Sequence, residues 1–136
     1  MGAWAEDTFG NDDACDWIYD FLDEPGLETV RAVLSEAIAN DDYMESDEGA
    51  AVLGACEVIA RLQGHWGVKN SYSESLDKWI EANPQTVPGD FKALASQAID
   101  RVLGEDSELV ELWEEDGPNE AWRAAVEDLR TRAAKN

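Results

Sequence analysis

The chain has 136 residues and a formal net charge of −21, from 31 acidic and 10 basic side chains. With 44% apolar residues and 6 tryptophans, residues 1–136 are sufficient for one domain with a substantial core, which excludes a disordered chain. The negative charge repels phosphate, so we expect no nucleic-acid partner. No apolar run approaches the roughly 20 residues of a membrane span, and the opening residues lack the basic and apolar parts of a secretory signal. We therefore expect a cytoplasmic protein that does not contact the membrane.

The first predicted helix covers about 11–23 and has a marked N-terminus. Asn11 is a candidate N-cap, and Asp12, Asp13 and Asp16 crowd the first turns, where the helix dipole favours negative charge. The apolar stripe at helical spacing consists of Ala14, Trp17, Ile18, Phe21 and Leu22. Pro25 and Gly26 follow and end the helix.

The second predicted helix covers about 27–39, and an acidic stretch at 41–48 connects it to the third. Ser46 is a candidate N-cap for this third helix, which runs over about 46–63. Apolar and small residues of this third helix occupy almost all of its faces. Such a helix is typical of the buried centre of a bundle.

The remaining helices are shorter and follow clear start and stop signals. Ser73 precedes a helix at 74–83, Pro88 opens one at 89–103, and Gly104 is suited to end it. Ser107 caps a short helix, Pro118 opens the last one, and we expect the tail at 130–136 to fray. No segment alternates as a strand does. The sequence thus predicts an all-α bundle of about six to seven helices around 46–63, without a sheet.

The tryptophans and cysteines favour structural roles. Four tryptophans lie on apolar stripes and are predicted to be core residues: Trp17, Trp79, Trp113 and Trp122. Trp4 and Trp66 lie outside the helices and are interpreted as lids over the bundle, with an exposed anchor for a partner as the alternative. Cys15 and Cys56 are expected to be free thiols in the core, because two cysteines make no disulfide framework.

Catalytic and metal-binding motifs are absent from the sequence. A single histidine, His65, leaves no His-based metal site, and neither a Cys-x-x-Cys pair nor a phosphate-binding or nucleophile loop occurs. We therefore assign no catalytic residue, no metal ligand and no cofactor, and favour a non-enzyme. The alternative is a Mg²⁺- or Mn²⁺-dependent nucleotide hydrolase that uses carboxylates. Its candidate Glu-x-x-Glu pairs are Glu45 with Glu48, Glu108 with Glu111, and Glu111 with Glu114, a spacing that 31 acids also produce by chance.

The acidic charge is concentrated at the start of the chain. Residues 1–60 contain 16 acids and one base, Arg31, whereas residues 61–136 contain 15 acids and 9 bases. This asymmetry predicts an acidic face that binds a basic protein, as in immunity proteins. Helix N-termini account for some of these acids, and the candidates that remain for binding are Asp20, Asp23, Glu24, Asp41, Asp42 and Glu45. Adaptation to a salty cytoplasm is the alternative origin of the charge. The partner and the oligomeric state stay open.

The opening pattern resembles a known family. Met1-Gly2-Ala3-Trp4, then Phe9 and Asn11-Asp12-Asp13-Ala14, then Asp16-Trp17 resemble the small bacterial proteins of domain of unknown function 4259. Ala5 departs from the family, which usually has glycine there. The resemblance implies a bacterial, intracellular, helical domain without an established activity. It also implies that residues 1–10 are ordered and that the motif is structural, with Trp4 and Phe9 docked on the bundle, Asn11 capping the first helix, and Asp12, Asp13 and Trp17 within it.

Overall fold

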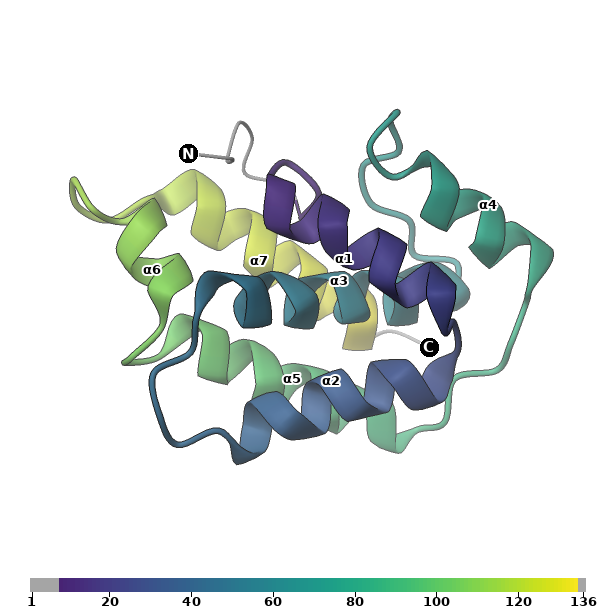
Figure 1. Cartoon of the computed structure of the whole chain (residues 1–136), viewed down its shortest axis with the longest axis horizontal. Helices are drawn as coiled ribbons and strands as arrows, with labels where there is room; N and C mark the ends of the chain where they lie inside the picture. Colours follow the sequence, from purple (N-terminus) through teal and green to yellow (C-terminus); the bar gives the residue numbers. More distant parts are fainter. Residues whose placement is uncertain (1–7, 135–136) are drawn as a thin grey trace.

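A computed structural model describes residues 8–134 of the chain (Figure 1). Within this range the helices are α1 (Asp12–Asp23), α2 (Leu27–Ala39), α3 (Ser46–Leu62), α4 (Glu74–Ala82), α5 (Asp90–Leu103), α6 (Glu108–Trp113) and α7 (Glu120–Ala134). The same range contains no strand, and its one isolated bridge pairs Met44 with Ser107. The all-α prediction is confirmed.

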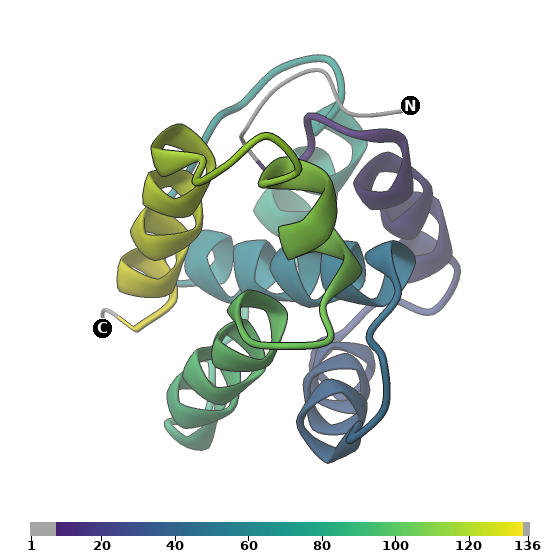
Figure 2. The same ribbon diagram turned by 90° about the vertical axis from the view of Figure 1, so that its left-hand side faces the viewer.

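Helix α3 forms the centre of the bundle, as its sequence predicts. It packs against each of the other helices, and Figure 2 shows it crossing the middle of the molecule. Helices α1 and α2 cover one side of α3, while α5 and α7 cover the opposite side (Figure 2). Because α3 meets neighbours on all sides, nearly every residue from Gly49 to Arg61 is buried.

Two glycines let other elements approach α3 closely. A Cβ atom at Gly54 would lie 2.5 Å from Cε3 of Trp17, and one at Gly49 would lie 2.7 Å from Cδ1 of Leu109. These positions therefore seat α1 and α6 directly on the α3 backbone. The Trp17 ring also stacks on Phe21, with the ring centroids 5.2 Å apart.

Two of the three predicted serine caps, Ser73 and Ser107, stand at the N-cap positions of α4 and α6. No serine of 46, 73 or 107 makes a side-chain cap bond, and the N-cap of α3 is Glu45 rather than Ser46. Ser46 Oγ instead donates to Asp13 at 3.0 Å, and Ser73 Oγ donates to Asp77 at 2.7 Å. The hydroxyls of Ser46 and Ser73 thus donate to carboxylates instead of capping a helix, because hydrogen bonds to charged acceptors are the stronger ones.

The predicted frayed tail is wrong for the described residues from 130 to 134. Helix α7 continues to Ala134, since Ala133 is buried and Arg132 is held by a buried carboxylate on α3. Residues 135–136 and Trp4 lie outside the described residues.

The other tryptophans and the cysteines fit the predictions. Trp17 and Trp122 are buried, while Trp66, Trp79 and Trp113 are half-buried against the core. Neither cysteine is in a disulfide: Cys56 is buried, which raises the pKa of its thiol, and the half-buried Cys15 donates to the carbonyl of Phe9 at 3.4 Å.

Candidate binding surface

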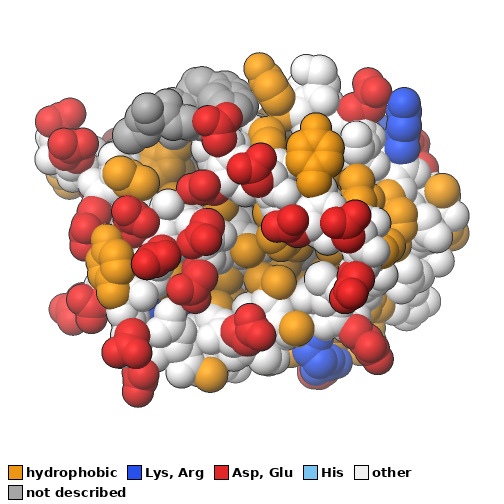
Figure 3. Space-filling model, viewed as in Figure 1, with side chains coloured by type: hydrophobic (Ala, Val, Ile, Leu, Met, Phe, Trp, Pro, Cys, Tyr) orange, Lys and Arg blue, Asp and Glu red, His pale blue; other side chains and the backbone are white. Residues whose placement is uncertain are grey.

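The acids of the first three helices form an exposed surface. Thirteen of them are solvent-exposed: Asp12, Asp13, Asp16, Asp20, Asp23, Glu24, Glu28, Glu36, Asp41, Asp42, Glu45, Asp47 and Glu48. Among residues 8–134, none of these acids takes part in an ion pair. Figure 3 shows this face densely covered by acidic side chains, with basic side chains only near its edges. We call these thirteen residues the acidic surface.

The acids of the rest of the chain are arranged differently. Arginines and one lysine pair with many of them: Glu57, Glu74, Asp77, Asp90, Asp100, Glu114, Glu127 and Asp128. Arg31, the one base of residues 1–60, pairs with Asp90 of α5 at 2.7 Å. Eight of the sixteen other described acids are thus paired, whereas none of the thirteen acids of the acidic surface is.

The backbone of the loop between α2 and α3 is held by Arg101 of α5. Nε of Arg101 donates to the carbonyl of Asn40 at 3.0 Å, and its Nη2 donates to the carbonyl of Asp42. The guanidinium thus bonds to backbone carbonyls of the loop, while the side chains of Asp41 and Asp42 stay exposed. This contact fixes the loop without neutralising its carboxylates through a salt bridge.

The far end of the same loop is tied to α6. Met44 is fully buried and exchanges two backbone hydrogen bonds with the segment 106–108, at 2.7 and 2.9 Å. Tyr43 donates to Glu111 Oε1 at 3.0 Å. Partial burial, this hydrogen bond and the charges of Glu111, Glu108 and Glu45 raise the pKa of Tyr43 to about 12. Glu111, Glu108 and Glu45 thus place three carboxylates around Tyr43 at this end of the acidic surface.

The six predicted binding residues are all exposed, but they form two groups. Asp20, Asp23 and Glu24 lie at the C-terminal end of α1, whereas Asp41, Asp42 and Glu45 lie in the α2–α3 loop. These two regions stand at opposite ends of the face in Figure 1. The acids that the sequence assigned to helix N-termini belong to the same surface, so the structure supports an extended face rather than one cluster.

Four of the five carboxylates of the Glu-x-x-Glu pairs accept hydrogen bonds from the protein, and Glu48 accepts from Asn40 at 3.2 Å. Glu108 accepts from the backbone N–H of Ser46 at 2.7 Å, and Glu111 accepts from Tyr43. Glu114 accepts two hydrogen bonds from Arg123, at 2.7 and 2.8 Å, and these bonds lower the pKa of Glu114 to about 2. No three His, Cys, Asp or Glu residues in the described part of the chain are placed to hold a metal ion.

Three of the described N-terminal motif residues, Phe9, Asn11 and Trp17, make structural contacts. Asn11 Oδ1 accepts from the Ala14 backbone N–H at 2.8 Å, which confirms the cap of α1. Phe9 is buried, and the Arg61 guanidinium carbon lies 5.5 Å from the centre of its ring. Asp12 and Asp13 are exposed in the first turn, and Trp17 is buried on Gly54. The motif thus anchors α1 to α3 and covers a charged group in the core.

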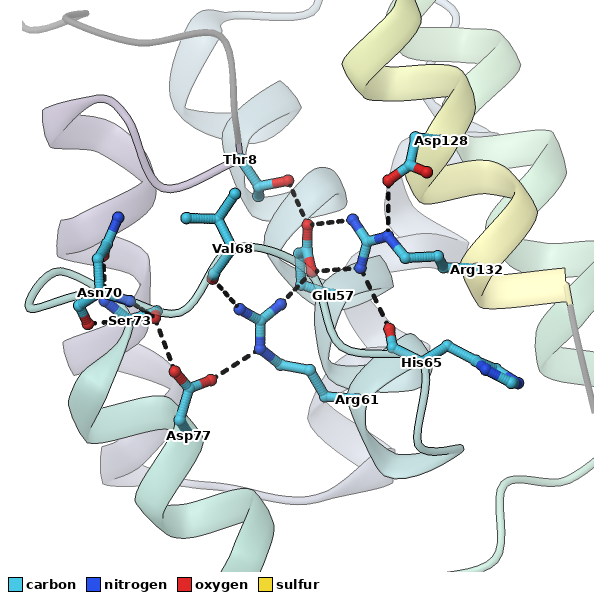
Figure 4. A network of polar contacts seen from close by, with 10 residues as sticks. All are labelled: Thr8, Glu57, Arg61, His65, Val68, Asn70, Ser73, Asp77, Asp128 and Arg132. Carbon is cyan, nitrogen blue, oxygen red and sulfur yellow. Dashed lines mark hydrogen bonds and ion pairs between the residues drawn. The ribbon is translucent and has the colours of Figure 1, made fainter.

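A buried charge network, shown in Figure 4, was not predicted from the sequence. Its members are Glu57 and Arg61 of α3, Asp77 of α4 and Arg132 of α7. Arg61 pairs with Glu57 and, at 2.7 Å, with Asp77, and Arg132 pairs with Glu57 at 2.9 Å. Two acids and two bases balance each other. The i, i+4 spacing of Glu57 and Arg61 in an otherwise apolar helix is the signal that could have revealed the network.

The network is closed by polar groups from the surrounding loops. Thr8 donates to Glu57 at 2.6 Å, Arg61 donates to the carbonyl of Val68 at 2.7 Å, and Arg132 donates to the carbonyl of His65 at 3.3 Å. Burial raises the pKa of Glu57, but the hydrogen bonds and charges of Arg132 and Arg61 outweigh burial and hold this pKa below its ordinary value. A hollow of about 110 Å³ adjoins the network, yet each guanidinium nitrogen already has a protein acceptor. The network locks α4, α7 and the 65–73 loop onto α3.

The fold and this surface define an acidic all-α domain with thirteen exposed, unpaired acids on its first three helices and the loops between them. A family model described as "Domain of unknown function (DUF4259)" matches residues 2–125, and the chain belongs to this family. Neither the curated proteins nor the solved structures gave a match. In the described residues, every helix is too short or too polar to cross a membrane.

Proposed function

We propose that this protein is a non-catalytic binding protein that presents its acidic surface to a basic protein partner, in the manner of an immunity protein. The observation that carries the proposal is the set of thirteen exposed acids without an ion pair. Exposed like charges repel one another and reduce the stability of the compact state. A basic partner would relieve this repulsion and would be steered to the surface at long range.

The rigidity of the loop between α2 and α3 also supports binding. Arg101 holds the backbone of this loop, and buried Met44 fixes its end. A loop fixed before binding loses little conformational entropy when a partner arrives, and this preserves more of the electrostatic gain as affinity. The acids of the loop are therefore suited to contact a partner without rearrangement.

Three triple variants test the proposal. The α1 triple (D20N/D23N/E24Q) and the loop triple (D41N/D42N/E45Q) each remove three charges from the acidic surface. The control triple (E115Q/D116N/E120Q) removes three exposed acids from the region between α6 and α7. All three variants have the same net charge, so any difference between them reports the position of the charges.

The measurement is the dissociation constant for a lysine- and arginine-rich peptide of about 14 residues, determined by calorimetry at low and at moderate salt. We expect the α1 and loop triples to weaken binding roughly tenfold, and the control triple to weaken it far less, because charges close to the bound peptide are screened least. Equal weakening by all three triples would show that only net charge matters. The proposed surface would then be wrong.

A further inference from the structure

A hollow between α2 and α3 lies within the acidic surface. Its volume is about 70 Å³, and it is lined by Val33, Glu36 and Ala37 of α2 and by Glu48 and Ala51 of α3. Val33 and Ala51 are half-buried apolar residues, whereas Glu36 and Glu48 are exposed. The hollow therefore has an apolar floor between two carboxylates.

Helix α1 supplies the opposite side of this region. Helices α1 and α2 both pack on α3, and both lie on its near side in Figure 1, one above it and one below it. Figure 3 shows apolar side chains in the middle of this face with acidic side chains on both sides. Along α1, Asp13, Asp16 and Asp20 are exposed at spacings of three and four residues, so they form one row on the helix.

We propose that this part of the acidic surface receives an amphipathic helix of the partner, with one apolar side chain in the hollow and lysine or arginine residues on both flanks. The proposal rests on the proposed function and specifies the partner chemistry. An amphipathic basic helix carries an apolar stripe bordered by positive charge. That pattern is complementary to an apolar floor that lies between Glu36 and Glu48, with the α1 row on the same face of the molecule.

The test uses two synthetic peptides of about 14 residues, or four helical turns, composed only of leucine and lysine. In the first, the leucines fall on one helical face. In the second, the same residues are scrambled so that no face is apolar. We expect the amphipathic peptide to bind the wild-type protein roughly tenfold more tightly than the scrambled one, because one aliphatic side chain becomes buried.

Variants of the hollow locate the binding. Ala51→Trp fills the hollow and should weaken binding of the amphipathic peptide roughly tenfold. The control variant Ala124→Trp, on the exposed face of α7, should bind this peptide with unchanged affinity. Val33→Thr keeps the shape of the floor and adds a hydroxyl, and it should also weaken binding of the amphipathic peptide. If circular dichroism shows that Ala51→Trp does not fold, the affinity of Val33→Thr tests the proposal in its place.

The outcomes separate the two proposals. Equal affinity for both peptides, or no effect of Val33→Thr and Ala51→Trp, would overturn the helix proposal and leave the acidic surface as a binding face. If neither peptide binds the wild-type protein at low salt, the proposed function itself is wrong, and the helix proposal fails with it.

Discussion

Replacing Glu57 with glutamine tests the buried charge network most severely. Glu57 is 4% exposed and accepts hydrogen bonds from Thr8, Arg61 and Arg132. In the E57Q variant, the two buried arginines retain only Asp77 as a buried negative partner, and the amide NH₂ group adds a donor where acceptors are needed. The variant therefore leaves one of the two arginines without a buried negative partner, since Asp128, the remaining partner of Arg132, is exposed.

The expected loss of folding stability in E57Q is large. Removing one partner from a buried ion pair costs about 3–5 kcal/mol, out of a total stability on the order of 5–15 kcal/mol. With a urea m-value of about 2 kcal/mol/M, the unfolding midpoint should fall by roughly 1.5–2.5 M. The control is Asp128→Asn, which removes an exposed partner of Arg132 whose side chain is 65% accessible, and it should cost at most about 1 kcal/mol.

The pH dependence provides an independent check. Because the folded pKa of Glu57 is lowered, its ionisation stabilises the protein above the unfolded pKa of about 4.3 and loses this effect as the pH falls through the folded pKa. The stability gap between the wild type and E57Q should be constant from about pH 7 to 5 and narrow below about pH 4. Similar midpoints for E57Q and D128N at pH 7 would refute the reasoning.

Three further predictions concern other elements. Gly54→Ala should lower the free energy of unfolding by about 1–3 kcal/mol in thermal melts, because its Cβ would overlap the Trp17 ring. The control Gly89→Ala has open space around its Cβ and should be neutral or stabilising, and equal effects of the two variants would contradict this packing. Asn11→Ala should cost about 0.5–2 kcal/mol through the lost cap, and an unchanged melting temperature would show that the cap contributes nothing. KCl should raise the melting temperature of the wild type up to about 0.5 M, and by less in the loop triple, because salt screens the unpaired acids. A rise that continued well above 1 M in both proteins would favour adaptation to salt instead.

The helices could be predicted because their boundaries carry local signals. Asn11, Pro25 and Gly104 mark ends of helices, and the predicted ranges of the first five helices agree with the observed ones to within one residue at each end. Ser73 and Ser107 stand at N-cap positions as predicted, but Ser46 does not cap α3, and its hydroxyl bonds to Asp13, a carboxylate distant in sequence. Local propensity contains no information about such partners.

The candidate surface could be predicted only in part. Charge counting located the acid-rich segment, but it does not show that the thirteen exposed acids of this segment have no ion pair or that its buried Glu57 is paired twice. The buried network joins Glu57 to Arg132 across 75 positions. In the sequence, both residues resemble ordinary charged positions on solvated helix faces, because burial depends on how α3, α4 and α7 pack.

The central claim is that the acidic surface is the binding face. Chemical-shift mapping of the isotope-labelled protein with the lysine- and arginine-rich peptide tests it directly. The account predicts that shifted amides fall within α1, α2 and the α2–α3 loop, and that adding KCl reverses the shifts. Shifts centred on α4 or α7, or spread evenly over the molecule, would contradict it.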